Sequence, residues 1–292
     1  MLAELSHFAL IAELGTFTAA AGRAHLSQPA LTASVQRLEA WAGAALLTRG
    51  RRGAELTAAG AALLPRARAA LAAVEDGRRA VAEVAGLRAG HVRIGAGATA
   101  CTYFLPALLA RFRRAHPGLH LSLREAFTDD LDQQVATGQL DLAIVTRTRT
   151  RLTGPADPWG SDELIAVGAP DQVGAGVSAA AAPWIAFADG SPTRAMLLRH
   201  VPATSIVMEL ASIAAVLGHA RAGLGLALVS RAAAAADLAR GALVVAPQRF
   251  TPLRRRLAVR HRGDDRLPPA AAALRVLLLA HAPQPGIPGR HG

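Results

Sequence analysis

Residues 58–88 consist almost entirely of Ala, Leu, Val, Arg and Glu, interrupted by one Pro and three Gly. Because Ala, Leu, Arg and Glu are strong helix formers, this segment predicts a single long helix. Before it, residues 1–57 alternate short helical patterns with turn signals. After it, from Gly90 onward, strand-like and helix-like segments alternate, which predicts an α/β domain.

Length and cysteine content narrow the class of protein. A chain of 292 residues is long enough for two or three domains. The single cysteine, Cys101, excludes a disulfide scaffold and any multi-cysteine zinc or iron–sulfur site, and it suits a reducing cytosol. The N-terminus lacks the basic region and cleavage signal of a secretion peptide, and no apolar run reaches about 18 residues. We therefore expect neither export nor a membrane span.

The net charge of +11 raises the possibility of a nucleic-acid partner, but the excess is spread along the chain. Lysine is absent, so every basic residue is an arginine. The local balance is more informative, because between positions 23 and 52 five arginines face only Glu39. These arginines are Arg23, Arg37, Arg49, Arg51 and Arg52.

Residues 16–40 predict two short helices joined by a tight turn. Thr16 or Thr18 can cap a helix that runs to about Ala24, and Ser27 can cap a second one with Pro29 in its first turn. One face of the second helix is an apolar stripe of Leu31, Val35 and Leu38. We expect a helix-turn-helix over about residues 18–37 whose DNA-facing residues are Ser27, Gln28, Pro29, Ala30, Thr32, Ala33, Gln36 and Arg37. The alternative is a plain amphipathic hairpin with a solvated face.

The segment 46–57 resembles a hairpin with a basic tip between Gly50 and Gly53. Beside a recognition helix, such a hairpin would be a wing that contacts the DNA backbone through Arg49, Arg51 and Arg52. The alternative is a solvated basic loop.

These patterns together resemble the winged helix-turn-helix of LysR-type transcriptional regulators. The matching residues are Phe17-Thr-Ala-Ala-Ala, Leu26-Ser-Gln-Pro-Ala-Leu-Thr, Leu38-Glu39, Gly43, Arg49 and Leu56-Thr-Ala-Ala-Gly60. Later segments also resemble the family, namely Gly90-His-Val-Arg-Ile-Gly95, Leu105-Pro106, Phe112, His116-Pro117-Gly118, Gly138-Gln-Leu-Asp141-Leu-Ala-Ile and Ala222-Gly-Leu-Gly-Leu-Ala. Two departures are Leu47, where the family usually has Phe, and Thr32, where Ser is commoner.

The resemblance implies three regions. Residues 1–60 would be the winged helix-turn-helix, 61–89 a linker helix that pairs two subunits, and 90–292 an effector-binding domain. That domain would consist of two Rossmann-like halves, as in periplasmic binding proteins, with subdomain I at about 90–160 and 266–282 and subdomain II at about 161–265. The chain would cross between the halves near residues 146–150 and 260–265.

The long helix carries a roughly heptad apolar register, in which Pro65 would kink the helix and Arg78 interrupts the stripe. The expected dimerisation residues are Leu64, Leu71, Val74 and Val81. The alternative is a helix packed on its own domain.

The region after Gly90 predicts strands at 91–95, 119–124, 141–145, 163–167, 184–187, 205–208, 226–229 and 253–259. It predicts helices at 103–115, 129–137, 211–222 and 269–280. In such a fold the ligand cleft lies where strands give way to helix N-termini. The expected effector-binding residues are Thr99, Ala100, Cys101, Thr102, Thr128, Thr146, Ser191, Thr193 and Arg194, with Arg194 as a carboxylate clamp. Alternatively, each is an ordinary cap or loop residue.

The sequence contains no convincing arrangement of catalytic residues. His116 and His120 flank a Pro-Gly turn rather than one helix face, no nucleophile elbow is present, and a disulfide switch at Cys101 would need a second cysteine. We therefore expect no catalytic residue, no metal and no cofactor.

The sequence thus predicts a cytoplasmic, nucleoid-associated bacterial transcription regulator rather than an enzyme. Its partners would be a dyad-symmetric operator on double-stranded DNA, a small-molecule effector such as an organic anion, and a second copy in a homodimer or homotetramer. RNA polymerase would be a further partner if the protein activates transcription. The alternative is a binding protein or enzyme of the solute-binding fold with an incidental helical domain.

Overall fold

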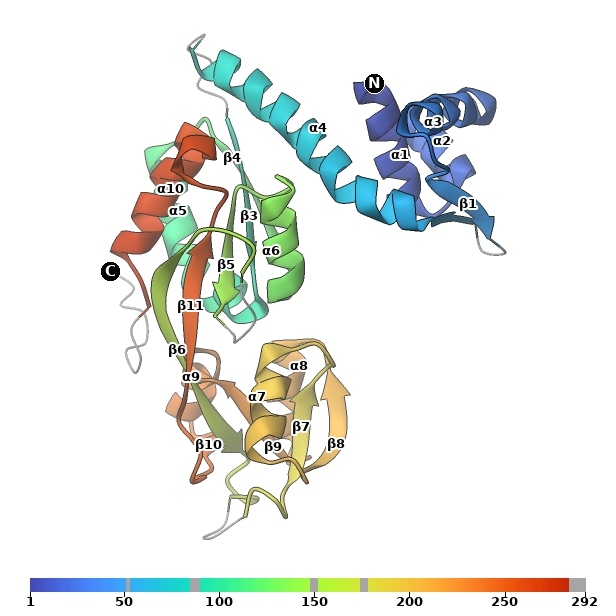
Figure 1. Cartoon of the computed structure of the whole chain (residues 1–292). Coiled ribbons are helices and arrows are strands. Elements are labelled where there is room, and N and C mark those ends of the chain that lie inside the picture. The colour runs from blue at the N-terminus through green and yellow to red at the C-terminus, as the bar shows by residue number, and fades with distance from the viewer. Residues whose placement is uncertain (51–52, 85–89, 148–151, 174–177, 284–292) are drawn as a thin grey trace. The chain divides into compact units, whose positions relative to one another are not determined.

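The computed structural model describes residues 1–50, 53–84, 90–147, 152–173 and 178–283. The chain forms two compact units. The N-terminal unit is built around residues 1–88, and the C-terminal unit contains Ala89–Val135 and Leu140–Gly292. Figure 1 shows the elements of each unit.

The N-terminal unit contains four helices and a two-stranded hairpin among its described residues. They are α1 (Leu2–Leu14), α2 (Phe17–Ala24), α3 (Gln28–Ala42), β1 (Leu47–Gly50), β2 (Gly53–Leu56) and α4 (Ala58–Val84). The core consists of the buried side chains Phe8, Ile11, Leu31, Leu38 and Leu46 with smaller neighbours. The sequence pattern did not reveal α1, because apolar residues occur on all sides of it.

The C-terminal unit contains a nine-stranded mixed sheet in the order β4-β3-β5-β11-β6-β9-β7-β8, with β10 paired to β6. The strands of its first half are β3 (His91–Ala96), β4 (His120–Glu125) and β5 (Leu142–Thr146). Those of its second half are β7 (Pro183–Phe187), β8 (Ser205–Leu210), β9 (Leu226–Ser230) and β10 (Val244–Val245). Strands β3, β4 and β5 are parallel, as are β7, β8 and β9.

Successive side chains of each strand point to opposite faces of the sheet, and in each half helices pack against both faces. In β5, Leu142 and Ile144 pack against α5 (Leu105–Ala115) and α10 (Pro269–Ala280), whereas Ala143 and Val145 pack against α6 (Thr128–Ala136). The second half repeats this layering with three further helices. They are α7 (Pro192–His200), α8 (Ile213–Arg221) and α9 (Arg231–Ala239). The fold is therefore α/β with buried parallel strands, as the sequence predicts.

Two long antiparallel strands join the halves. Strand β6 (Ala156–Gly168) pairs with β9 through residues 164–167, and β11 (Leu253–Arg260) pairs with β5 through residues 257–260. The chain thus crosses between the halves inside β6 and β11. The predicted crossing at 260–265 is wrong, because residues 257–260 already belong to the first half. The other predicted crossing, 146–150, extends past the described residues after position 147.

Several element boundaries differ from the prediction for identifiable reasons. The polar start of β6, Ala-Asp-Pro-Trp-Gly-Ser-Asp, resembles a loop but pairs with β11 along its backbone. Helices α7 and α9 were not predicted, because a Pro start and an alanine run hide any apolar stripe. The helix expected from residue 103 begins at Leu105, after a π-helical turn at Ala100–Phe104.

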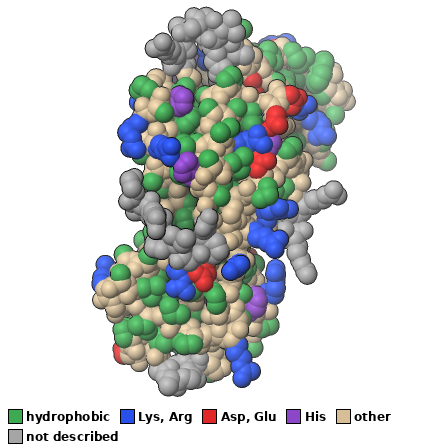
Figure 2. All heavy atoms as spheres, turned by 90° about the vertical axis from the view of Figure 1, so that its left-hand side faces the viewer, with side chains coloured by type: hydrophobic (Ala, Val, Ile, Leu, Met, Phe, Trp, Pro, Cys, Tyr) green, Lys and Arg blue, Asp and Glu red, His purple; other side chains and the backbone are tan. Residues whose placement is uncertain are grey.

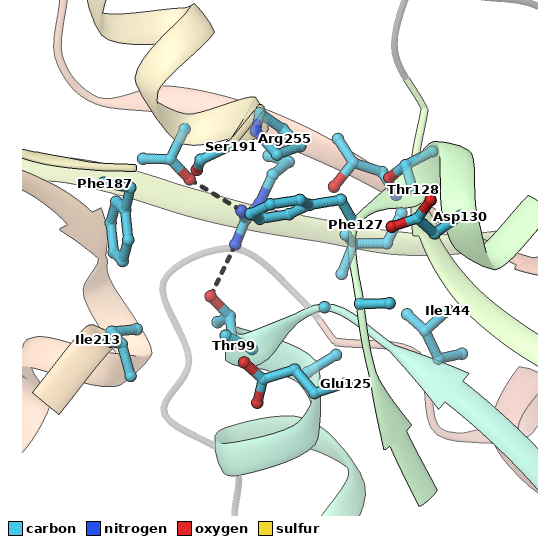
Figure 3. A pocket seen from close by; sticks show the side chains of 18 of the residues that line it. Thr99, Glu125, Phe127, Thr128, Asp130, Ile144, Phe187, Ser191, Ile213 and Arg255 are labelled. Carbon is cyan, nitrogen blue, oxygen red and sulfur yellow. Dashed lines mark hydrogen bonds between the residues drawn. The ribbon is translucent and has the colours of Figure 1, made fainter. Parts of the chain in front are cut away.

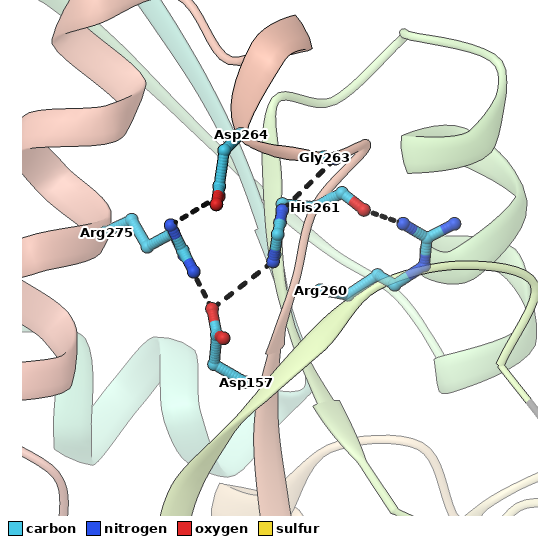
Figure 4. Close-up of polar contacts among 6 residues, drawn as sticks. All are labelled: Asp157, Arg260, His261, Gly263, Asp264 and Arg275. Carbon is cyan, nitrogen blue, oxygen red and sulfur yellow. Dashed lines mark hydrogen bonds and ion pairs between the residues drawn. The ribbon is translucent and has the colours of Figure 1, made fainter.

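A polar cluster fixes α10 to the start of β6 (Figure 4). The Arg275 Nε lies 2.5 Å from Asp157 Oδ2, and His261 Nε2 lies 3.3 Å from the same oxygen. A second Arg275 nitrogen contacts Asp264 at 2.8 Å. Nearby, the buried Arg260 pairs with Asp132 on α6. These contacts connect both helical layers of the first half to the central strands.

On the face drawn in Figure 2, basic side chains are scattered among hydrophobic and acidic ones. This matches the even spread of basic residues along the sequence. No helix in the described part of the chain is long and apolar enough to cross a membrane.

Candidate functional site

The N-terminal unit positions α3 through two side-chain caps and a short turn. Thr16 Oγ1 accepts from the Ala19 N–H at 3.2 Å, and Ser27 Oγ accepts from the Ala30 N–H at 3.3 Å. Between the helices, His25 adopts a left-handed conformation with φ 54°, and its N–H closes the end of α2. This local chemistry forms the predicted helix-turn-helix.

The two faces of α3 lie as the sequence predicts. The side chains of Leu31, Ser34, Val35 and Leu38 are buried. His7 on α1 contacts the Ser34 hydroxyl at 2.7 Å, which satisfies that buried polar group. On the opposite side, Thr32 and Ala33 are half-buried, and the remaining predicted residues are exposed: Ser27, Gln28, Pro29, Ala30, Gln36 and Arg37.

Three of the predicted DNA-facing side chains already make contacts within the protein, the first being Ser27 through its cap on Ala30. Thr32 Oγ1 donates to the Gln28 carbonyl at 2.9 Å. Arg37 Nε lies 3.1 Å from Glu4 Oε1, yet the Arg37 side chain is 63% exposed. Arg37 therefore remains accessible from solvent, and Gln36 is exposed as well.

The hairpin is fixed to the helices at both ends. Glu39 Oε1 accepts from the N–H groups of Leu46 and Leu47, at 2.7 and 3.2 Å. At the tip, Gly53 has φ 131°, and a Cβ there would lie 2.2 Å from the Gly15 carbonyl oxygen. Only glycine fits this close approach. The predicted wing is therefore a β-hairpin.

The basic residues of this hairpin are only partly described. Arg49 pairs with Ala54 across the hairpin, whereas the Arg49 side chain and all of Arg51 and Arg52 lie outside the described part. Their role as backbone contacts remains a prediction from the sequence.

Helix α4 divides the predicted dimerisation stripe into two parts. Leu64 and Leu71 pack against the buried cluster around Phe8 and Ala67, so they contribute to the core of their own unit. Val74 and Val81, in contrast, are 52% and 70% exposed. The alternative of packing on its own domain therefore holds for Leu64 and Leu71, whereas dimerisation through Val74 and Val81 stays a prediction.

The C-terminal unit contains a cavity of about 430 Å3 at the carboxyl ends of β3, β4, β5, β7 and β8. This is where open α/β sheets bind ligands. Six predicted residues line it, drawn from both halves: Thr99, Ala100, Thr128, Thr146, Ser191 and Thr193.

Three predicted residues do not line this cavity. Arg194 contacts Glu209 at 2.6 Å and the Phe187 carbonyl at 3.2 Å, so the expected carboxylate clamp is wrong. Cys101 and Thr102 lie within the π-helical turn Ala100–Phe104, in which Ala100 and Phe104 face the cavity instead. Thr102 is exposed to solvent and does not line the cavity.

Cys101 packs against the core of the first half, and its thiol contacts the Ala96 carbonyl at 3.4 Å. Burial, aided by the negative charge of Glu125, raises the pKa of Cys101 to about 11. The group is therefore a protonated thiol at neutral pH, unlike the thiolate of a redox sensor.

The central polar residue of the cavity, Arg255, was missed by the sequence reasoning (Figure 3). Its guanidinium donates to Thr193 Oγ1 at 3.1 Å and to Thr99 Oγ1 at 3.0 Å, which links the two halves. It also pairs with the buried Asp162 at 2.5 Å, and Ser230 donates to the other Asp162 oxygen at 2.6 Å. A signal was available, because Leu253, Arg255 and Leu257 share one face of a predicted strand.

The remaining lining combines charge with apolar surface. Arg124, Glu125 and Asp130 are the other charged lining residues. The larger apolar lining side chains are Phe104, Phe127, Ile144, Phe187, Ile213 and Leu257. Among the described residues, no cluster of His, Cys, Asp or Glu could hold a metal. The arrangement is that of a binding site for a small organic molecule.

Comparison with known proteins decides the family. Residues 2–61 match the model of the bacterial regulatory helix-turn-helix protein, lysR family, and residues 85–283 match the LysR substrate binding domain. The chain belongs to the LysR family. It is accordingly a transcriptional regulator with a DNA-binding helix-turn-helix and an effector-binding domain, and not an enzyme.

Relatives and solved structures span nearly the whole chain. The HTH-type transcriptional regulator CbbR of Rhodospirillum rubrum is 30% identical over 289 residues, covering 96% of each chain. Full-length CbnR, solved in complex with its target DNA, has a TM-score of 0.67 at 25% identity and covers 97% of this chain and 100% of its own. Full-length LysG of Corynebacterium glutamicum, solved with bound effector Arg, has a TM-score of 0.64 at 20% identity and covers 96% and 97%.

Proposed function

We propose that this regulator reads a dyad-symmetric operator through α3, with the β1–β2 hairpin on the DNA backbone, and that the cavity beside Arg255 holds its effector. The DNA-contacting residues are Ser27, Gln28, Pro29, Ala30, Thr32, Ala33, Gln36 and Arg37, with Arg49, Arg51 and Arg52 on phosphates. The observation that carries the DNA part is the exposed face of α3 opposite a fully buried stripe.

We also propose an oligomeric state and a cellular location for this function. Two copies pair through the exposed part of α4 and present two equivalent α3 helices, and further contacts between effector-binding domains give a homotetramer. The working regions are residues 1–60, 61–89 and 90–292. The protein acts on the bacterial nucleoid in the cytoplasm, and when it activates transcription it contacts RNA polymerase.

The effector is a small polar molecule with at least one anionic group. The cavity offers the hydroxyls of Thr99, Ser191 and Thr193, and α7 begins at its wall. Free N–H groups at a helix start favour a negative charge.

Band shifts test the DNA part with two kinds of variant. Gln36→Ala should lose about 1–3 kcal/mol of discrimination at one base position, because Gln pairs bidentately with adenine. Arg51→Ala or Arg52→Ala should weaken binding to all sequences alike and lower the salt slope by about 1.

The matched control is Arg199→Ala, which removes the same charge from an exposed position on α7. It should leave the salt slope unchanged. Equal loss on specific and random DNA for Gln36→Ala would show that another face of α3 enters the groove.

A further inference from the structure

We propose that the effector is a zwitterion, an α-amino acid with an apolar side chain. Its carboxylate binds at Ser191 and Arg255, and its ammonium group binds at the wall formed by Glu125 and Asp130. This rests on the proposed function, since it assigns the ligand class of the same cavity.

The charges of the lining residues argue against a purely anionic ligand. Arg255 is compensated by Asp162 at 2.5 Å, with both side chains buried. Glu125 and Asp130 also line the cavity, and neither has an ion-pair partner among the residues that the structure describes. Of the lining residues that the structure describes, Arg124 is the only other charged one, so Arg124, Glu125 and Asp130 together carry an unbalanced negative charge that attracts a cationic group.

The opposite part of the lining is built to receive a carboxylate. Ser191 is buried at the start of α7, yet its side chain makes no capping hydrogen bond. Arg255 has only 9% of its side chain exposed, and its Nε–H has no acceptor within the described part of the chain. A ligand carboxylate here accepts from the Ser191 hydroxyl and from the first free N–H groups of α7.

The apolar residues of the lining fit a ligand that has an apolar part between its carboxylate and its ammonium group. Figure 3 shows Phe187 and Ile213 on one side of Arg255 and Ile144 on the other, and Phe127 also lines the cavity. Phe127 is 47% exposed, so a large aromatic surface is available at the cavity. Sugars and phosphorylated metabolites lack such an apolar body.

The ligand class can be tested on the full-length chain by comparing amino acids with analogues that each lack one charged group. Calorimetry compares L-phenylalanine with 3-phenylpropanoate and 2-phenylethylamine, and L-leucine with 4-methylpentanoate and 3-methylbutylamine. At least one amino acid should bind about tenfold more tightly than both of its analogues, because each analogue lacks one charged group. An acid or amine that binds as tightly as its amino acid overturns the proposal, and so does a set in which no amino acid binds.

Paired substitutions locate the two ends of the ligand. The double variant Glu125→Gln, Asp130→Asn should lose about tenfold in amino-acid affinity while its affinity for the acid analogue stays within about twofold. Ser191→Ala should weaken the amino acid and the acid analogue alike. Asp129→Asn is the control, because it makes the same change one residue away at an exposed side chain that does not line the cavity. Unchanged amino-acid affinity in the double variant contradicts the assignment.

A band shift without ligand, run on the same preparations, distinguishes a wrong ligand class from a wrong proposed function. If DNA binding is intact and no amino acid is preferred, the ligand class is wrong and the proposed function stands. If sequence-specific DNA binding is also absent, the proposed function itself has failed.

Discussion

His261 is held in its neutral form by the groups around it. Its Nδ1 accepts from the Gly263 N–H at 3.2 Å, and its Nε2 faces Asp157 at 3.3 Å, so the proton of the neutral ring resides on Nε2. Burial lowers the pKa of His261, and the positive charge of Arg275 lowers it further, whereas Asp157 and Asp264 raise it. Contact with Arg275 lowers the pKa of Asp157, which is therefore charged at neutral pH.

This environment predicts a loss of stability in mild acid. Below its ordinary pKa of about 6.5, His261 takes up a proton in the unfolded chain before it does so in the folded one. The free energy of unfolding should fall between about pH 7.5 and about pH 5.5, by at most about 1.4 kcal/mol per pH unit for one proton. In His261→Gln, which keeps a donor for Asp157, urea unfolding should show a smaller fall.

The control for this experiment is His116→Gln, because His116 is an exposed histidine. Its urea unfolding should retain the pH dependence of the parent. A parent and a His261→Gln variant with identical pH dependence would show that His261 does not couple protonation to folding.

At the residue scale, sequence reasoning succeeded where the rule was local. Hydroxyl residues such as Thr99 and Thr128 could be placed because they follow predicted strands, and ligands of open α/β sheets bind at the carboxyl ends of the strands. Arg194 was misassigned because its partner Glu209 lies on β8, a strand whose position beside α7 the sequence does not reveal. Arg255 was missed because the predicted strand at 253–259 does not reveal its partners Thr99 and Asp162, which lie far away in the sequence.

Helix α4 combines a core-forming stretch and an exposed apolar stretch. The first packs through Leu64, Ala67 and Leu71, and the second exposes Val74 and Val81. In the proposed dimer, the exposed stretch with Val74 and Val81 is the surface that the second copy covers. The most direct test is to place a charge in each stretch.

We expect Val81→Glu to lower the dimer population and DNA affinity while the free energy of unfolding of the N-terminal unit stays within about 0.5 kcal/mol. Leu71→Glu should lower both the dimer population and that free energy, the latter by about 2–4 kcal/mol, because it buries a charge. Light scattering across protein concentrations and urea unfolding measure the two effects. Ala73→Glu, exposed and outside the stripe, is the control, and an unchanged oligomer in Val81→Glu contradicts the dimer assignment.

At the element scale, strong periodicity and good caps made structure predictable. Helix α10 lies at its predicted residues 269–280, because an N-terminal proline and a clear apolar stripe define it. The hairpin β1–β2 was predictable from its glycines. The length of β6 was not, because its hydrogen bonds come from the partner strand β11, whose paired residues lie 89 to 104 positions later.

The molecule as a whole joins two sites in separate units, so ligand control requires a conformational equilibrium that both sites influence. An effector that binds one state more tightly shifts that equilibrium, and operator DNA must change effector affinity by the same factor. Strands β6 and β11 run through both halves beside the cavity, and Arg255 on β11 contacts residues of each half. The proposed effector response depends on this connection between the two halves.

The central claim is that α3 reads DNA as part of a symmetric dimer. The most direct measurement is selection of duplexes from a random pool by the full-length chain and by Gln36→Ala. The parent should enrich inverted repeats with half-sites about one helical turn apart, and Gln36→Ala should lose preference at one position in each half-site, symmetrically. Enriched duplexes without dyad symmetry, or identical preferences for both proteins, would contradict the account.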